Sequence, residues 1–298
     1  MKIAITGASG LIGTAVSSHL AAAGHETVSL VRREPKADEI GWDPAAGHLD
    51  ADDLRGVDAI VHLAGAGIGD RRWTDDYKRV LMDSRVDGTS LIASKLADLG
   101  ADGPQVFLSG SAIGFYGERG DEELDESASA GTGFLAEICK RWEAATAPAE
   151  SAGVRVAHLR TGIVLTPAGG ALKKMLPLFK LGAGGRFGNG RQWMSWISLT
   201  DEIRAIEHLL TSGLSGPVNL TAPAPVRNAE FAKTLGRVLG RPSLLPVPSF
   251  GPKLLLGSEL ADALLFDGQR VVPSALREDG FEFSHADLAT ALRAELGR

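Results

Sequence analysis

The side chains best suited to proton transfer lie in the middle third of this 298-residue chain. Ser111 and Tyr116 fall within SAIGFYG, and Lys140 lies on GFLAEICKRWE, which is predicted to be helical. A hydroxyl, a phenol or an amine can act as a general acid or base when its surroundings tune its pKa. Ser111, Tyr116 and Lys140 are therefore the candidate catalytic residues. The sequence leaves two alternatives open: Tyr116 packs against the bound cofactor, and Lys140 is simply solvated.

A glycine-rich segment at the start of the chain is typical of a phosphate-binding turn. TGASGLIG follows a short apolar strand at 2–6 and runs into a helix predicted at 11–24. Gly7 permits a tight turn, Gly10 lets the backbone approach a pyrophosphate, and Gly13 allows the helix to pack closely on the strand. The free N–H groups and the dipole of the helix start then face the phosphates. The segment predicts a dinucleotide site.

Two arginines end the second predicted strand, at 26–31. A site for NAD would place an acidic residue there, to accept a hydrogen bond from the ribose 2′-hydroxyl. Arg32 and Arg33 instead suit a 2′-phosphate, which guanidinium groups bind through charge-assisted hydrogen bonds. The strand end predicts NADP(H) as the cofactor. The alternative is that Arg32 and Arg33 are a solvated surface pair that balances the charge of Glu34.

Strands alternate with helices along the first half of the chain. Further strands are predicted at 58–65, 105–110 and 154–160, and helices at 74–99 and 134–151. Later helices are predicted at 170–181, 199–211, 228–239, 251–265 and 285–297, between loops rich in Gly and Pro. This order predicts an α/β fold with a Rossmann-like, doubly wound parallel sheet. The sheet domain would cover 1–165, with some later segments returning to it. A smaller C-terminal substrate lobe would cover 166–298, including an extension at 245–298.

Composition narrows the class of protein. The net charge of −6 gives no reason to expect nucleic-acid binding, which usually requires a basic domain or stripe. No apolar run approaches the roughly 18 residues of a membrane span, and the N-terminus does not read as a signal peptide. The only cysteine, Cys139, rules out an internal disulfide and gives no metal-site spacing. We predict a cytoplasmic protein with a small-molecule substrate and no metal, nucleic acid or membrane partner; its oligomeric state is left open.

Several motifs carry a resemblance to a known superfamily. Gly-x-x-Gly-x-x-Gly after Thr6 resembles the extended branch of the short-chain dehydrogenases/reductases. HLAGAG (62–67) resembles the branch's motif beside the adenine ribose, and RVDGT (85–89) its Asn-Val-x-Gly-Thr segment, with Arg85 in the Asn place. SAIGFYG (111–117) and WISLTDEIRAI (196–206) resemble its later motifs.

A narrower resemblance covers nearly the whole chain. GFLAEICKRWE, GGRFGNGRQWMSWI and the run from LLPVPSF to FSHADLATAL are similar to an atypical subgroup of the NAD(P)-dependent epimerase/dehydratase-like proteins. The subgroup carries a short C-terminal extension, and some members are labelled cell-division inhibitors. The resemblance implies a Rossmann fold and a nicotinamide cofactor.

The resemblance and the loops at the strand ends also predict which residues form the site. The expected cofactor-binding residues are Thr6, Gly7, Gly10, Leu11, Ile12, Gly13, Val31, Arg32, Arg33, Leu63, Ala64, Gly65, Arg85, Ser109 and Val164. The expected residues of the substrate pocket are Arg71, Trp193 and Trp196.

The superfamily's usual acid/base pair, Tyr-x-x-x-Lys, is absent from this sequence. If Lys140 holds the lysine place, the tyrosine place is Ala136; with Glu143 as the anchor, the pair becomes Leu135 and Cys139. We predict an NADP-dependent oxidoreductase or epimerase acting on a small polar substrate, with Tyr116, Lys140 or water supplying protons. The alternative is a non-catalytic sensor of NADPH.

Overall fold

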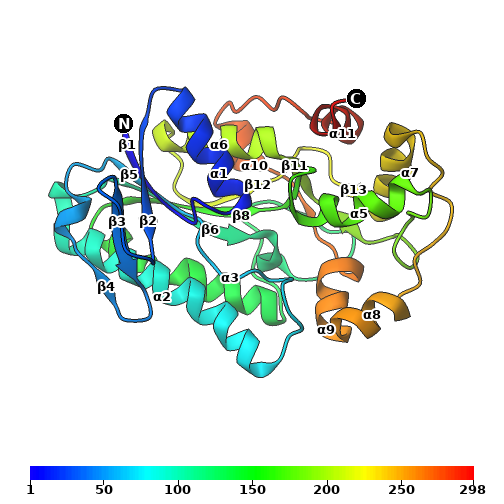
Figure 1. The fold of residues 1–298 in the computed structure, drawn as a ribbon, viewed down its shortest axis with the longest axis horizontal. Coiled ribbons are helices and arrows are strands. Elements are labelled where there is room, and N and C mark those ends of the chain that lie inside the picture. Colours follow the sequence, from blue (N-terminus) through cyan, green and yellow to red (C-terminus); the bar gives the residue numbers. More distant parts are fainter.

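An eight-stranded sheet forms the centre of the protein (Figure 1), in a computed structural model that describes residues 1–298. The strand order is β12-β8-β6-β5-β1-β2-β3-β4. Neighbouring strands are parallel, except that β4 is antiparallel to β3. The strands are β1 (Lys2–Thr6), β2 (Glu26–Val31), β3 (Glu39–Asp43), β4 (His48–Leu49), β5 (Ala59–His62), β6 (Val106–Ala112), β8 (Arg155–Thr161) and β12 (Gly216–Leu220).

Helices cover both faces of the sheet, which confirms the predicted doubly wound, Rossmann-like fold. One apolar core joins Ile3 and Ile5 of β1 to helices α1 (Leu11–Ala22) and α6 (Leu199–Thr211). The other core joins Ala4 and Phe107 to α2 (Asp75–Leu99) and α4 (Ala147–Ser151). Helix α3 (Phe134–Ala144) lies beside α2 and covers the end of β6.

Two predicted helices are interrupted in the structure. The helix expected at 134–151 is divided between α3 and α4, because Pro148 lacks an N–H and cannot continue a helix that began earlier. The helix expected at 251–265 is divided at Gly257, because the φ of 89° at this residue lies outside the range of a right-handed helix. It forms α8 (Phe250–Leu256), α9 (Ser258–Ala261) and a π-helical turn at Asp262–Phe266.

The segment after residue 165 belongs partly to the sheet and partly to a lobe. Strand β12 forms the edge beside β8, where Pro217 is tolerated because an edge strand leaves some N–H positions unpaired. The lobe packs Trp196 and Phe231 into a third core. Its helices are α5 (Gly170–Lys180), α7 (Asn228–Leu239) and α11 (Leu288–Leu296), and its short strands are β9 (Ile163–Leu165), β10 (Trp193–Met194), β11 (Trp196–Ser198) and β13 (Val226–Arg227).

Several contacts hold the C-terminal extension against the sheet domain. Arg72, on the loop before α2, donates hydrogen bonds to the carbonyls of Leu254 and Leu255, and Lys78 pairs with Glu259 at 2.6 Å. Strand β14 (Arg270–Val271) pairs with β7 (Glu123–Leu124), and α10 (Ser274–Glu278) packs on β12. None of the helices combines the length and the apolar character needed to traverse a bilayer.

Candidate functional site

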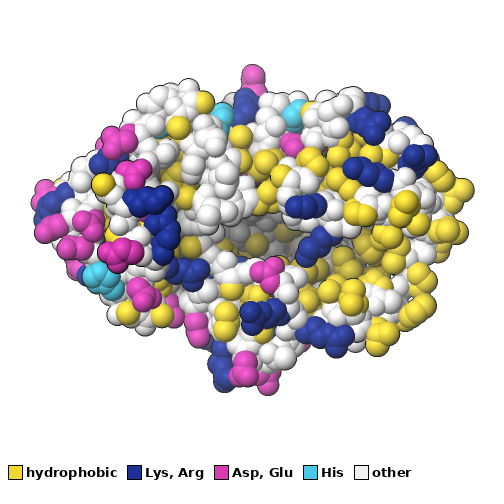
Figure 2. Space-filling model, in the orientation of Figure 1, with side chains coloured by type: hydrophobic (Ala, Val, Ile, Leu, Met, Phe, Trp, Pro, Cys, Tyr) yellow, Lys and Arg dark blue, Asp and Glu magenta, His cyan; other side chains and the backbone are white.

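The carboxyl ends of the central strands meet at the hollow in the middle of the molecule (Figure 2). From β1 the chain winds outward to β2 and β3, and it then returns to β5 and β6 on the other side of β1. Ligands of open α/β sheets bind at such a switch point. The predicted cofactor residues lie on or next to this edge, because parallel strands end on the same side.

The phosphate loop has the geometry that its glycines predict. Gly7 has a φ of 67°, and a Cβ on it would lie 2.9 Å from the Leu63 carbonyl oxygen. A Cβ on Gly13 would overlap the Gly7 carbonyl oxygen, so this glycine lets α1 pack on the loop. Gly10 is exposed, and no side chain caps the first turn of α1. The first N–H groups of the helix therefore remain available to an anion.

Thr6 needs a correction, because its side chain is completely buried. Its hydroxyl accepts hydrogen bonds from the backbone N–H groups of Leu63 and Ala64, both at 3.1 Å. Burial lowers the pKa of His62 to about 3, so the ring is neutral and its Nδ1 can accept the Thr6 proton at 2.7 Å. Thr6 thus joins the ends of β1 and β5 and lies beneath the site rather than lining it.

The two arginines after β2 have different surroundings. Arg33 forms a two-pronged ion pair with Glu39, with N–O distances of 2.5 and 2.7 Å, and its pKa is raised by this hydrogen bonding. Arg32 is exposed and has no carboxylate within ion-pair distance. Neither arginine pairs with the Glu34 carboxylate. Arg32 is therefore the freer of the two to meet a 2′-phosphate.

Arg85 lies on the opposite side of β1 from these arginines. A Cβ on Gly65 would be 3.3 Å from its Cζ, and its guanidinium stands 5.0 Å from the Trp142 ring centroid. It donates a hydrogen bond to the Leu81 carbonyl at 3.0 Å and pairs with no carboxylate. Trp142 packs against Gly110 of β6. The guanidinium therefore lies at the carboxyl ends of β5 and β6.

A buried polar network lies at the end of β6. Ser111 donates a 2.6 Å hydrogen bond to Oε1 of Glu143 on α3. Arg160 on β8 donates to both Glu143 oxygens at 2.8 Å, and its side chain is only 4% exposed. Cys139, one turn before Glu143, donates from Sγ to the Ala112 carbonyl at 3.6 Å, and burial raises its pKa to about 11. Cys139 and Glu143 are four residues apart on this helix, the spacing of the missing pair.

Tyr116 is built into the interior instead of facing the hollow. It is completely buried, its hydroxyl donates to Asn219 Oδ1 at 2.7 Å, and it accepts from Arg160 at 3.0 Å. Burial raises its pKa to about 12, despite the opposing effect of Arg160. The structure therefore corrects the expectation that Tyr116 transfers protons. Its side chain packs in a small core with Ile113, Leu124 and Val271, so it does not offer the contact with a bound cofactor that the alternative described.

Three further expectations are corrected by burial or exposure. Lys140 is half exposed and pairs with Glu137 of the same helix at 3.1 Å, which fits the solvated alternative. Ser109 is completely buried, with no partner for its hydroxyl, so it lies below the surface of the site. Trp196 is also completely buried, and its Nε1 donates to the Ala224 carbonyl, so it belongs to the lobe core rather than to a pocket.

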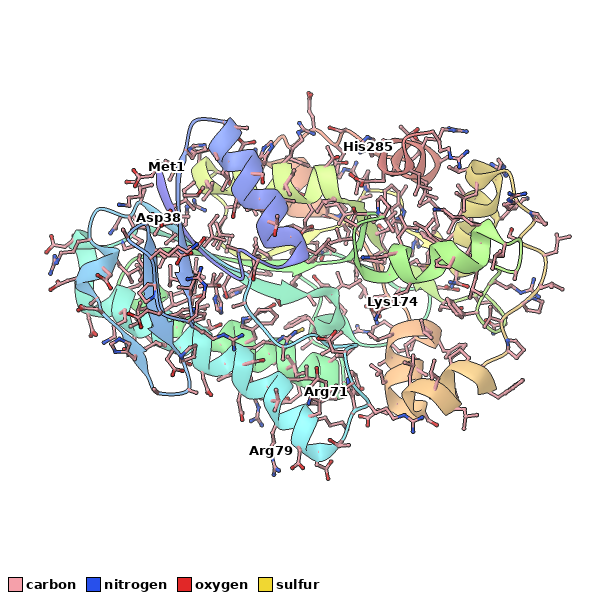
Figure 3. The ribbon with its side chains drawn as sticks, viewed as in Figure 1. Met1, Asp38, Arg71, Arg79, Lys174 and His285 are labelled. Atoms are coloured by element: carbon pink, nitrogen blue, oxygen red, sulfur yellow. The ribbon has the colours of Figure 1, made fainter.

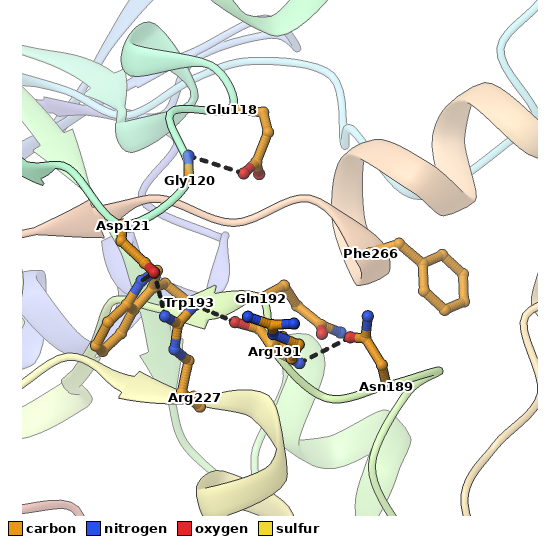
Figure 4. Close-up of a pocket in the computed structure, with 9 residues that line it drawn as sticks. All are labelled: Glu118, Gly120, Asp121, Asn189, Arg191, Gln192, Trp193, Arg227 and Phe266. Carbon is orange, nitrogen blue, oxygen red and sulfur yellow. Dashed lines mark hydrogen bonds and ion pairs between the residues drawn. The ribbon is translucent and has the colours of Figure 1, made fainter.

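Trp193 does line a cavity, of about 340 Å³ (Figure 4). Its Nε1 donates to Asp121 at 3.0 Å, and Arg227 stands 4.0 Å from its ring centroid. The hydrogen bonds from Trp193 and Arg227 lower the pKa of Asp121. The other lining residues are Glu118, Gly120, Asn189, Arg191, Gln192 and Phe266.

Unpaired cations approach the hollow from two elements (Figure 3). Lys174 extends from α5 toward the 67–72 loop, where a Cβ on Gly69 would be 3.9 Å from its Nζ. Arg71 on that loop lies 5.7 Å from the Tyr77 ring centroid and has no carboxylate partner. The remaining predicted residues Leu11, Ile12, Val31, Leu63, Ala64 and Val164 are partly buried at the same edge or just beyond it.

Comparison with known proteins matches the chain to two families. The NAD dependent epimerase/dehydratase family matches residues 3–220, and a domain of unknown function, DUF1731, matches residues 247–295. An epimerase family protein of Mycobacterium tuberculosis (strain CDC 1551 / Oshkosh) is 48% identical over 292 residues, which cover 97% of this chain and 96% of that protein.

Two solved structures are similar over the full length of this chain. The crystal structure of human epimerase family protein SDR39U1 (isoform 2) with NADPH has a TM-score of 0.91 at 32% identity, and the match covers 100% of this chain and 99% of that chain. A nucleoside-diphosphate sugar epimerase from Corynebacterium glutamicum has a TM-score of 0.81 at 39% identity, over 100% of this chain and 58% of that chain. These matches confirm the resemblance predicted from the motifs. The chain belongs to the NAD dependent epimerase/dehydratase family.

Proposed function

We propose that this protein binds NADP(H) and acts as an oxidoreductase or epimerase on a small polar substrate that carries a hydroxyl or carbonyl group. One observation supports it most: a serine hydroxyl and a carboxylate are joined by a 2.6 Å hydrogen bond at the carboxyl end of β6. This is the strand next to β5 at the switch point, on the side away from the arginines after β2. The pair offers a route for a proton where the usual tyrosine is missing.

The residues of the phosphate loop fit a dinucleotide. The uncapped first turn of α1 and the exposed Gly10 would hold the pyrophosphate, and Arg32 would hold the 2′-phosphate. The human relative is described with NADPH, which agrees with this choice of cofactor. With the adenosine half over β2, the nicotinamide half would extend over β5 and β6, toward Gly65 and Arg85. The cofactor, when bound, supplies or takes up a hydride.

Ser111 and Glu143 would move the proton that accompanies the hydride. When a substrate hydroxyl is oxidised, its proton passes to Ser111 Oγ while the Ser111 proton passes to Glu143 Oε1. The O–H bond of the substrate breaks and a new O–H bond forms on the carboxylate; reduction runs the same steps in reverse. Arg160 holds Glu143 in place through two hydrogen bonds. The Cys139 thiol, with its raised pKa, stays protonated near neutral pH and keeps its hydrogen bond to the Ala112 carbonyl beside this pair.

The test is a screen of carbonyl compounds and sugars for oxidation of NADPH, followed by kinetics on variants. Ser111→Ala should lower kcat by about 10²–10⁴-fold, the usual contribution of a general acid or base, and leave NADPH affinity nearly unchanged. Lys140→Ala is the matched control from the same helix as Glu143, and its kcat should equal that of the wild type. Full turnover in Ser111→Ala would refute the proton route.

A second function, that of a non-catalytic sensor of NADPH, is favoured by the absence of Tyr-x-x-x-Lys and by the burial of Tyr116. It predicts tight NADPH binding with no turnover in the same screen. A single compound whose turnover depends on Ser111 would exclude it. The cytoplasmic location stays a prediction, since one relative, from Arabidopsis thaliana, is described as chloroplastic.

A further inference from the structure

Large hydrophobic side chains protrude from the end of the molecule formed by α5, the 241–249 segment and α8. Those of Leu181, Leu244, Phe250 and Leu254 are 82%, 84%, 74% and 77% exposed, and those of Leu245 and Leu255 are 66% and 73% exposed. We call these six residues the lobe patch. A single exposed leucine on a soluble protein needs no explanation, but a cluster of this kind usually marks an interaction surface.

The segments that carry the patch are held next to one another. Val247 donates a backbone hydrogen bond to the Arg186 carbonyl at 2.8 Å, and a Cβ on Gly182 would lie 3.5 Å from Pro242. Arg72 binds the carbonyls at the end of α8. The backbone of α8 is therefore fixed while its leucine side chains point outward, so the patch is preformed.

The charge around the patch is one-sided. Residues 161–200 contain five Lys or Arg and no Asp or Glu, and residues 231–258 contain four Lys or Arg and no Asp or Glu. The first acids after α8, Glu259 and Asp262, are each paired with a lysine. The whole chain, in contrast, carries a net charge of −6. Figure 2 shows hydrophobic and basic side chains at this end, while acidic side chains gather at the end formed by β3, β4 and α2. Lys180 precedes Leu181, Arg241 lies three residues before Leu244, and neither cation forms an ion pair with a carboxylate.

We propose that the lobe patch attaches the protein reversibly to the surface of a membrane that contains anionic lipids. Leucine and phenylalanine side chains would enter the boundary between headgroups and acyl chains, and Lys180 and Arg241 would meet the lipid phosphates. The proposal departs from the prediction that there is no membrane partner, which was based on the absence of a membrane-spanning run; attachment to a membrane surface needs no such run. The proposal does not depend on the proposed enzymatic activity.

Two other occupants fit these observations less well. A two-fold contact with a second copy would bring the unpaired cations of both copies into one interface, because the same surface is used twice. An amphipathic peptide binds in a groove whose side chains are recessed, whereas four residues of the patch are at least 74% exposed. Protruding apolar side chains with a basic surround suit a deformable, anionic lipid surface.

The full chain should be sedimented with vesicles of phosphatidylcholine alone and with vesicles that also contain phosphatidylglycerol. Binding should be stronger to the anionic vesicles and should weaken as salt is added. Leu254→Ser combined with Leu255→Ser should lower the partition coefficient by more than about tenfold, since burying one leucine alone is worth about that much. Lys180→Gln with Arg241→Gln should lower binding to the anionic vesicles several-fold and leave the phosphatidylcholine control unchanged.

Val80→Ser is the matched control, because Val80 is an exposed hydrophobic residue that lies on α2, outside the patch. It should bind vesicles like the wild type, and every variant should keep the wild-type melting temperature because the altered side chains are exposed. The proposal is overturned if the wild type does not bind anionic vesicles, or if the double leucine variant binds them with the wild-type partition coefficient. It is also overturned if the wild type does not bind vesicles but forms a dimer or a complex with an acidic amphipathic peptide, and the leucine variant forms neither.

Discussion

Replacing Glu143 with glutamine should destabilise the fold strongly. Glu143 is 10% exposed and Arg160 is 4% exposed, and three hydrogen bonds of 2.6–2.8 Å converge on the carboxylate. Glutamine offers only one acceptor oxygen and turns an N–H₂ group toward the guanidinium. Removing one partner of a buried ion pair typically costs about 3–5 kcal/mol, because the other charge is left uncompensated. For a chain of this size that corresponds to a fall in melting temperature of roughly 5–10 °C.

Denaturant unfolding and calorimetry of Glu143→Gln measure this loss. Glu137→Gln is the control on the same helix, since Glu137 makes its ion pairs with Lys140 and Arg141 at the surface. The control should melt close to the wild type, because surface ion pairs contribute little to stability. Adding Arg160→Met to Glu143→Gln should restore part of the stability, since no charge is then left unpaired. If Glu143→Gln melts within about 2 °C of the wild type, the loss of stability is only about 1 kcal/mol, and the reasoning about the network is wrong.

Three further predictions follow from single positions. Arg32→Ala should lower the ratio of NADPH to NADH affinity about tenfold or more, as expected for a lost charged hydrogen bond. Arg33→Ala should lower this ratio less, because Arg33 is already paired with Glu39. Calorimetric titrations of both cofactors measure the ratio, and equal losses in the two variants would contradict the prediction. Gly13→Ala should disrupt the loop and destabilise the fold, because its Cβ would overlap the Gly7 carbonyl, and a variant that melts and binds NADPH normally would disprove the packing role. Burial raises the pKa of Glu202 to about 8 from 4.5, so between these pH values the folded chain keeps a proton that the unfolded chain loses. The free energy of unfolding should therefore fall by up to about 1.4 kcal/mol per pH unit between pH 4.5 and 8. Glu202→Gln should flatten that slope in unfolding experiments, and an unchanged slope would show that Glu202 is ionised in the folded protein.

Much of the fold could be predicted because the relevant signals are local. An apolar strand, three glycines at fixed spacing and a helix identify the phosphate loop, since each feature depends on neighbours a few residues away. The alternation of strands and helices predicted the parallel sheet for the same reason. Strands β3 and β12 were missed, because Gly, Pro and polar residues interrupt the apolar ones in EIGWD and GPVNL, and these segments become strands by pairing with β2 and β8.

The sequence by itself determined which chemical groups are available, whereas the tertiary structure decided which of them face the site. Periodicity could not reveal that Tyr116 and Trp196 are completely buried, since their surroundings come from distant strands and helices. The same holds for the pairing of Ser111 with Glu143 and Arg160, which lie on β6, α3 and β8. The Cys139–Glu143 spacing was present in the sequence, but only the packing of α3 against β6 brings both side chains to the end of that strand. Burial and ion pairing depend on contacts far along the chain, and those contacts exist only once the sheet has formed.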